Sequence, residues 1–416
     1  MMSFIKFIGC GFIFALYLIG VIFIPIDLNT TTKIINATGV LSFFVVIFSP
    51  WHNYRKSIVI LTLGLLLLGA IDLIWYGIYK TGDVIYKNGY RGYLEAGKLL
   101  VFSSFTFLAL SNIRFRVISR FHVPVIFLTQ IIMFSRAFYQ SLYLHSERIA
   151  LSAMDGNSGE MGAATIAAYV VTFFGLYSAI VFIKLESKYK WFIFYASFAL
   201  SFTAIMMTET RAAIVVYPAM VIAILFIEYG RQRQFVIKSL SGFLVLFLCC
   251  GLLFNKEIDR RFNELKSDVS LFTKSNDSMS SVGARFSMIL AGFKSAPHGI
   301  EWQSLEQRAA NILDLSKKDS RYEGAAQFLN VHMHNEIAEA LSTKGIFGVV
   351  FLVIFYSSLI YYCIREKKYL LLVFPATIML FGISDVITHD KPIPASWIVC
   401  LLLSVLFLSN QDRKNI

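Results

Sequence analysis

Charged side chains are scarce in this chain. Only 15% of its 416 residues are Asp, Glu, Lys or Arg, whereas 57% are hydrophobic. The apolar residues gather into runs that are too long and too free of charge for a soluble core, so the sequence predicts an integral membrane protein. The net charge of +12 could indicate a nucleic-acid partner, but the basic residues lie in short loops between apolar runs. That placement is typical of membrane orientation, and we expect membrane lipids and no nucleic acid as partners.

Signatures of metal, redox and nucleotide chemistry are absent as well. The five cysteines show no CxxC or Cys/His metal spacing, and all fall inside apolar runs, at Cys10, Cys249, Cys250, Cys363 and Cys400. The sequence therefore predicts no disulfide framework and no cysteine metal site. There is also no GxxxxGK[ST], HExxH or GxSxG motif, which argues against a nucleotide-using cytoplasmic enzyme. We expect no cofactor, and a substrate that is already activated and lies in or at the membrane.

Twelve apolar runs are candidate transmembrane helices of an all-α polytopic membrane protein, because a helix of about twenty apolar residues crosses a bilayer. The first is too long for a signal-peptide core and has no A-x-A cleavage site, so we interpret it as a retained span. The second and fourth are short. In residue numbers the runs cover 4–26, 34–49, 57–79, 98–112, 122–143, 162–184, 191–208, 211–229, 235–254, 344–364, 369–387 and 393–410.

The loops between these runs alternate in charge. One set contains 17 Lys and Arg residues and the short loops of the other set contain 8, so the positive-inside rule places both termini in the cytoplasm. The chain then divides into residues 1–254 with spans 1–9, residues 255–343 as one large outer loop, and residues 344–416 with spans 10–12 and a cytoplasmic tail. Apolar residues recur at helical spacing in the loop, at Phe262, Leu265 and Val269 and again at Phe286, Ile289, Leu290 and Phe293. We expect amphipathic helices there, over the mouth of the bundle.

A cluster of polar side chains, Asn330 to Glu336, closes this loop just before the tenth run. Asn335 is a good helix cap, so His334 would lie just outside the positive end of a helix. A neutral imidazole there could take a proton from a hydroxyl, with Glu336 as the alternate base. A metal site of His332, His334 and Glu336 is the less favoured interpretation, because no fourth ligand cluster appears. Either histidine alone would be interpreted as structural.

Two arginines on the outer side are candidate anion ligands. Arg211 begins a span after Thr208-Glu209-Thr210, and Arg285 lies on a predicted loop helix. A guanidinium suits bidentate binding of phosphate oxygens. For Arg211 the alternative is a salt bridge to Glu209 or contact with lipid headgroups, and for Arg285 it is simple solvation.

Two carboxylates, Asp72 and Asp385, lie inside apolar runs near their outer ends. Intramembrane carboxylates are typical of proton or cation pathways, so a transporter or flippase that uses them is one possible function. They could equally hold an arginine in place, and we favour that structural role. Inverted repeats and paired broken spans, which would favour a transporter, are not evident.

At this point the sequence resembles a known family. Thr208-Glu209-Thr210-Arg211-Ala212, and Asn330 to Glu336 with Lys344-Gly345-Ile346-Phe347-Gly348, are similar to the two signature regions of the bacterial O-antigen ligase and polymerase superfamily. Three further stretches resemble the ligase branch in particular, in the same order and at similar spacing: Asp72 to Tyr76, Val282 to Arg285 and Ile383 to Val386. The likeness covers most of the chain.

The resemblance implies a membrane glycosyltransferase of GT-C-like architecture. Such a ligase moves O-antigen polysaccharide from undecaprenyl diphosphate to lipid A-core at the periplasmic face of the bacterial inner membrane, without metal or nucleotide. It implies Arg211, Arg285 and His334 as catalytic positions, the two arginines also binding the diphosphate, with His332, Asn335 and Glu336 among the substrate-binding residues. An O-antigen polymerase, which uses the same lipid donor, is the nearest alternative.

Overall fold

Helices make up all the regular structure in the described part of the chain. The computed structural model describes residues 2–48, 54–111, 118–154, 163–389 and 391–411, and within these ranges no β-strand occurs. The α-helices are α1 (Met2–Phe23), α2 (Leu28–Ile47), α3 (Lys56–Tyr79), α4 (Lys87–Leu110), α5 (His122–Phe138), α6 (Ala163–Ile183), α7 (Lys190–Met207), α8 (Arg211–Tyr229), α9 (Arg233–Leu253), α10 (Asn255–Ser275), α11 (Ser281–Lys294), α12 (Leu305–Lys318), α13 (Glu323–Gln327), α14 (Glu336–Arg365), α15 (Val373–Gly382) and α16 (Pro392–Gln411). Short 3-10 or π turns are η2 (Ile118–Phe121), η3 (Tyr139–Tyr143), η4 (Leu151–Met154), η5 (Ser320–Tyr322) and η6 (Tyr369–Leu372). The all-α prediction is confirmed.

Ten of the described helices are long and apolar enough to cross a membrane, namely α2 to α9, with α5 extended by η3, together with α14 and α16. Two shorter apolar segments, Phe7–Phe23 in α1 and Tyr369–Gly382 in η6 and α15, complete the set. These helices identify a multi-pass membrane protein. Each of the twelve expected runs overlaps one of these segments, but the number that crosses the membrane stays a prediction.

Two helices begin earlier than the apolar pattern predicts. The expected runs started at residues 34 and 98, whereas α2 begins at Leu28 and α4 at Lys87. The polar first turns of these helices hid their true starts. In α2, the Asp27 carboxylate accepts hydrogen bonds from the backbone N–H groups of Asn29 (2.9 Å) and Thr30 (3.2 Å). Such an N-cap stabilises a helix start whatever the hydropathy of the first turn.

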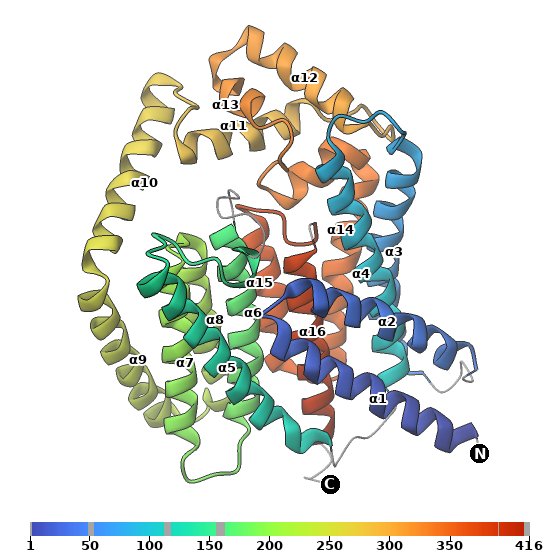
Figure 1. Cartoon of the computed structure of the whole chain (residues 1–416), viewed down its shortest axis with the longest axis vertical. Coiled ribbons are helices and arrows are strands. Elements are labelled where there is room, and N and C mark those ends of the chain that lie inside the picture. Colours follow the sequence, from blue (N-terminus) through green and yellow to red (C-terminus); the bar gives the residue numbers. More distant parts are fainter. Residues whose placement is uncertain (1, 49–53, 112–117, 155–162, 390, 412–416) are drawn as a thin grey trace.

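Helices α6 and α16 form the centre of the bundle (Figure 1). In their most apolar stretches of 18 residues, 94% and 89% of the residues are buried inside the protein. Close helix approach depends on small residues. A methyl group added at Gly39 of α2 would lie 2.3 Å from the Cβ atom of Phe102 in α4. Glycine at such positions lets helix backbones meet in a membrane bundle. By contrast α9 is only 22% buried and lies at the edge of the bundle.

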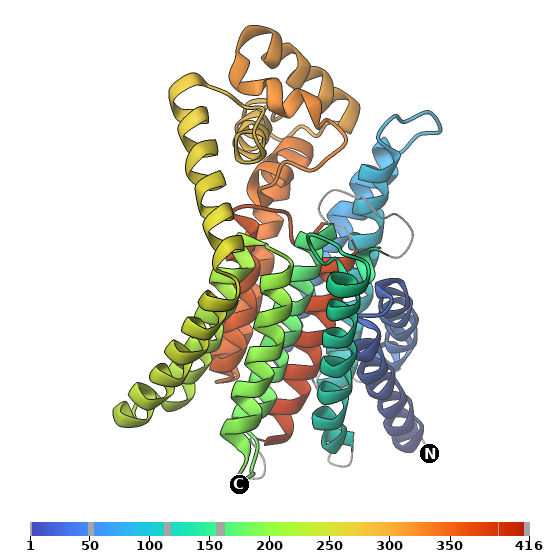
Figure 2. The same ribbon diagram turned by 60° about the vertical axis from the view of Figure 1, so that its left-hand side comes forward.

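Helices α10 to α13 form a separate layer at one end of the bundle, which we call the outer layer, and α10 continues from the end of α9 (Figures 1 and 2). This layer falls within residues 255–343, the segment expected to be a large loop with helices, and it contains α10 to α13. It is fastened to the bundle through Gln303. The backbone oxygen of Gln303 accepts from the Trp75 indole N–H (3.0 Å), and its side-chain Nε2 donates to the carbonyls of Ser295 and Ser342 (both 2.6 Å).

The start of α14 belongs to the outer layer, because the helix is broken at Gly345. Gly345 has φ 57° and ψ −150°, and a Cβ atom there would lie 2.5 Å from the Glu301 carbonyl oxygen. Only glycine tolerates both the conformation and the close approach. Residues 336–344 therefore form a short helix of their own above the long membrane-spanning part, eight residues earlier than the expected span start at 344. The division of the chain at 254 and 343 stays a prediction.

Candidate functional site

The predicted polar cluster lies between the outer helical layer and the bundle, at the start of α14. Asn335 is the N-cap, as expected: its Oδ1 accepts from the Ala338 backbone N–H (2.9 Å). Its Nδ2 also donates to the Ile383 carbonyl (3.0 Å), so the cap joins α14 to the segment that follows α15. His334, one residue earlier, has φ 47° in the left-handed region. That conformation costs about 1 kcal/mol or more and is held only where the surroundings dictate it.

Asp385 brings the two histidines together. Its Oδ1 lies 2.6 Å from His332 Nε2 and 3.5 Å from His334 Nδ1. The two imidazole rings have centroids 4.5 Å apart. The contact to His334 is too long for a good hydrogen bond, and among the described residues the buried Nδ1 of His334 has no hydrogen-bond partner. The sequence suggested an arginine as the partner of Asp385, and the structure shows histidine instead.

Burial and charge keep these groups in defined protonation states. Burial lowers the pKa of His334, and the neighbouring charge of His332 lowers it further, although Asp385 raises it. Burial alone would raise the pKa of Asp385, but the hydrogen bond from His332 and the neighbouring imidazole of His334 hold it well below its ordinary value. At neutral pH the arrangement is therefore an ionised carboxylate beside a neutral His334, which is the form of histidine that accepts a proton.

Glu336 has a different position from the one expected for a substrate ligand or alternate base. Its buried carboxylate accepts from the backbone N–H groups of Ile387 (2.6 Å) and Thr388 (3.1 Å) and from the Thr388 hydroxyl. It therefore fixes the segment that carries Asp385. Within the described ranges, His332, His334 and Asp385 form a set that could hold a metal, since their ligand atoms all lie within 4.8 Å of one another. Asp385 thus replaces Glu336 in the metal hypothesis of the sequence.

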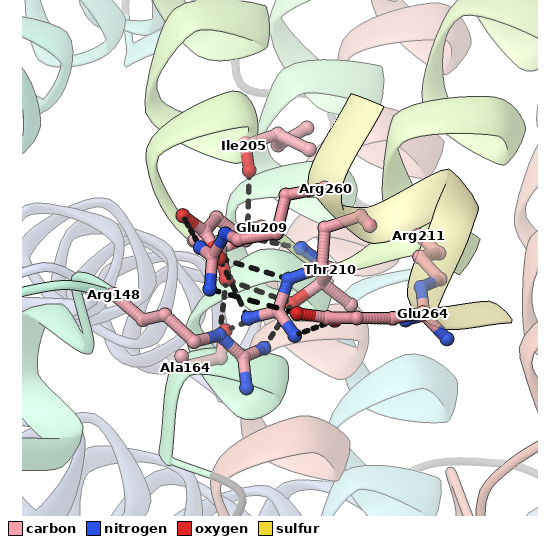
Figure 3. A network of polar contacts seen from close by, with 10 residues as sticks. Arg148, Ala164, Ile205, Glu209, Thr210, Arg211, Arg260 and Glu264 are labelled. Atoms are coloured by element: carbon pink, nitrogen blue, oxygen red, sulfur yellow. Dashed lines mark hydrogen bonds and ion pairs between the residues drawn. The ribbon is translucent and has the colours of Figure 1, made fainter. Parts of the chain in front are cut away.

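A group of arginines and carboxylates lies where α10 meets the turn before α8 (Figure 3). Glu209 accepts hydrogen bonds from Arg260 (2.6 and 2.7 Å) and from Arg261 (2.6 and 2.9 Å). Arg211 instead pairs with Glu264 of α10, at 3.2 Å. The suggested salt bridge between Arg211 and Glu209 is therefore wrong, because the two arginines of α10 occupy the Glu209 carboxylate.

Arg285 of α11 is near enough to this group and to the histidines to act on both electrostatically. Burial lowers the pKa of both His334 and Arg148, and the positive charge of Arg285 adds to the lowering at each. Arg285 is half-buried, and among the described side chains no carboxylate pairs with it. The three residues that the sequence singled out, Arg211, Arg285 and His334, thus belong to one electrostatic neighbourhood, although they come from three different helices or their ends.

A buried ion pair supports the histidine segment. Arg308 of α12 donates from Nη1 to both carboxylate oxygens of Glu339, each at 2.9 Å. Glu339 also accepts from the Met333 backbone N–H (2.8 Å) and from the Tyr93 hydroxyl. Because Met333 lies between the two histidines, this pair positions their backbone. No sequence pattern indicates this pair, since its two partners are 31 residues apart in different helices.

Two further residues near the site were not identified from sequence. His389 is buried, with its ring 4.1 Å from that of Tyr93 and 6.4 Å from that of His332. Burial lowers the pKa of His389 to about 3, so it adds no positive charge at neutral pH. Asp72, the other carboxylate that the sequence placed in an apolar run, pairs with Lys344 at 2.6 Å. Its partner is therefore a lysine and not the expected arginine, and its structural role stays a prediction.

Comparison with known proteins now identifies the family. Residues 196–353 match a family model described as O-antigen ligase. The O-antigen ligase of Escherichia coli (strain K12) is 30% identical to this chain over 395 residues, which are 94% of this chain and 90% of that protein. The chain belongs to the O-antigen ligase family. The segment matched by the family model contains Arg211, Arg285 and the histidine cluster, whereas Asp385 and Arg148 lie outside it.

Proposed function

We propose that this member of the O-antigen ligase family is a glycosyltransferase that moves O-antigen polysaccharide from undecaprenyl diphosphate to lipid A-core. Family membership supports a role in O-antigen and lipopolysaccharide assembly. The observation that carries the proposal is the neutral His334 beside Asp385, within the electrostatic reach of Arg285 and the arginine group. A base and an anion site on neighbouring elements are what transfer from a lipid diphosphate requires.

The arginines would act on the leaving group. When the bond between the anomeric carbon and the diphosphate oxygen breaks, the electron pair stays on the diphosphate, whose negative charge increases. Fixed guanidinium groups stabilise such developing charge in the transition state. Arg211 and Arg285 are the candidates, because Arg211 has only the partly exposed Glu264 as a partner and Arg285 has no carboxylate partner among the described residues.

His334 would act on the acceptor. The acceptor hydroxyl oxygen attacks the anomeric carbon while its proton passes to the imidazole. Asp385 lies beside Nδ1 of His334, and a carboxylate in that place favours the tautomer with the proton on Nδ1, which leaves Nε2 as the acceptor. The reaction is one direct displacement with inversion at the anomeric carbon. It needs no metal and no nucleotide.

The site would face the periplasm. The outer helical layer contains residues 255–343, the segment that the distribution of Lys and Arg places outside. Both lipid substrates reach such a site from the membrane, and both termini would be cytoplasmic. Asp72 and Asp385, which a transporter would use as coupling groups, are both engaged in pairs at the outer end of the protein.

The test is reconstitution. Purified full-length protein is incubated with undecaprenyl-diphosphate glycan and lipid A-core, without nucleotide and with EDTA, and joined lipopolysaccharide is the expected product. Transfer only between two undecaprenyl-linked chains would mean a polymerase, and movement of the glycan across the membrane without transfer would mean a transporter. Retention of the anomeric configuration in the product would reject single displacement.

Variants of the histidine separate its role from general stability. His334→Ala should abolish transfer while the protein stays folded and inserted. His298→Ala is the matched control, because His298 is exposed in the turn before α12 and lies outside the site. Near-normal ligation by His334→Ala would remove His334 as the base.

A further inference from the structure

Arg148 is held against the turn that carries Arg211. It lies in the irregular segment between η3 and η4, where its Nε donates to the Thr208 carbonyl (2.9 Å) and its Nη2 to the Thr210 hydroxyl (3.3 Å). The neighbouring Ile149 backbone N–H donates to the Met207 carbonyl (3.1 Å). These bonds fix the plane of the Arg148 guanidinium next to the start of α8 (Figure 3).

This arginine is half-buried, and among the described side chains no carboxylate forms an ion pair with it. The acid that acts on it electrostatically, Glu209, is already paired with Arg260 and Arg261. Burial lowers the pKa of Arg148, and the positive charges of Arg261, Arg285 and Arg211 lower it further. A partly desolvated positive charge among like charges is unfavourable unless an anion neutralises it.

The net charge of the whole group indicates the charge of the anion that would neutralise it. In the described part of the chain the group holds five arginines, which are Arg148, Arg211, Arg260, Arg261 and Arg285. Three carboxylates act on them, which are Glu209, Glu264 and Asp268. The excess of two positive charges equals the two negative charges of a diphosphate esterified at both ends.

We propose that Arg148 is a third diphosphate-binding residue of the site, beside Arg211 and Arg285. This inference rests on the proposed function and names a further residue for the donor. Two of the five N–H groups of the guanidinium are used in the bonds to the turn, so the others remain for phosphate oxygens in a fixed orientation. Arg148 is bound to the turn that precedes Arg211, and the charge of Arg211 acts on it, so we place both in one anion site.

The competing explanation is that Arg148 only fastens the turn. If Arg148 only holds the turn in place, its loss lowers the stability of the protein and weakens diphosphate binding only through Arg211, so Arg148→Gln has no further effect on the Kd of an Arg211→Gln protein. If Arg148 is a direct ligand, its loss weakens binding in the Arg211→Gln protein as well. Binding of a short lipid diphosphate therefore separates the two explanations, and it does so without any transfer reaction.

The experiment measures the Kd of farnesyl diphosphate for the purified full-length protein in detergent by calorimetry. Arg148→Gln should raise this Kd by at least about tenfold, both alone and in the Arg211→Gln protein, which is the typical effect of losing a charged hydrogen bond. Arg148→Lys should bind several-fold more weakly than the wild type, because a point charge replaces a planar fork. The matched control is Arg321→Gln, since Arg321 is exposed and pairs with Asp319, outside the arginine group.

Each outcome decides between the explanations. An unchanged Kd in folded Arg148→Gln, or no further change when it is added to Arg211→Gln, would overturn the proposal with or without loss of transfer and leave Arg148 as a fastener. If Arg148→Gln does not fold, the lysine variant carries the test, and a wild-type Kd there would also overturn it. If the wild-type protein transfers glycan and the Arg148 variants bind farnesyl diphosphate with the wild-type Kd, only this inference is refuted. If the wild-type protein neither binds farnesyl diphosphate nor transfers glycan, the proposed function itself is refuted.

Discussion

The ion pair between Arg308 and Glu339 gives the sharpest prediction about how the site is supported. The two side chains are only 3% and 4% exposed, and both carboxylate oxygens lie 2.9 Å from the guanidinium. Burial alone would lower the pKa of Arg308, but the carboxylate of Glu339 raises it above its ordinary value. Arg308→Met keeps the length of the side chain and removes its charge, so the Glu339 carboxylate is left buried with only hydrogen bonds to Met333 and Tyr93.

Stranding one partner of a buried pair costs about 3–5 kcal/mol. For a protein of this size that cost corresponds to a fall of about 3–6 °C in the midpoint of thermal unfolding. The double variant Arg308→Met with Glu339→Gln should recover most of the loss, because no buried charge is left without its partner. Thermal unfolding of the purified proteins in detergent, followed by intrinsic fluorescence, measures both effects.

The same pair should affect the reaction through the histidine backbone. Glu339 accepts from the Met333 N–H, between His332 and His334. Arg308→Met should therefore also reduce the rate of transfer below the unfolding temperature. The reasoning is refuted if Arg308→Met unfolds at the wild-type temperature, or if the double variant is no more stable than the single one.

Other predictions concern the reacting groups. Arg211→Lys should lose most transfer activity although the charge remains, because a point charge does not replace a bidentate fork; full activity would indicate simple charge anchoring to Glu264. Asp385→Asn should lower the rate of transfer about a hundredfold or more, the typical contribution of an oriented general base, and wild-type kinetics in that variant would remove Asp385 as an orienting group. In the wild type, transfer should fall only below about pH 6.5, because burial and His332 lower the pKa of His334; protonation of the base as the pH falls through that pKa stops the reaction, so an acid limb above pH 6.5 would contradict the assignment. Gly345→Ala should impair folding, as its Cβ would meet the Glu301 carbonyl, and unchanged expression and thermal unfolding would argue against the break in α14.

Several features could be predicted because they depend on local sequence. Hydropathy over about twenty residues decides whether a segment suits a membrane, so each expected run overlaps an observed apolar helix. A cap residue acts on backbone groups two or three positions away, so Asn335 could be assigned as the start of α14 before the fold was known. Helix starts with polar first turns, such as that of α2, were missed because hydropathy alone does not register them.

The sequence by itself determined the class of the protein, the places of its apolar helices and the polar segment that ends in Asn335. Tertiary structure alone decided which groups meet. Asp385 lies 53 residues from His332, Arg308 lies 31 from Glu339, and Arg148 lies 60 from the turn that it binds. Such pairs depend on which face each helix turns toward its neighbours, and that is fixed by side-chain packing across the whole bundle rather than by any nearby pattern.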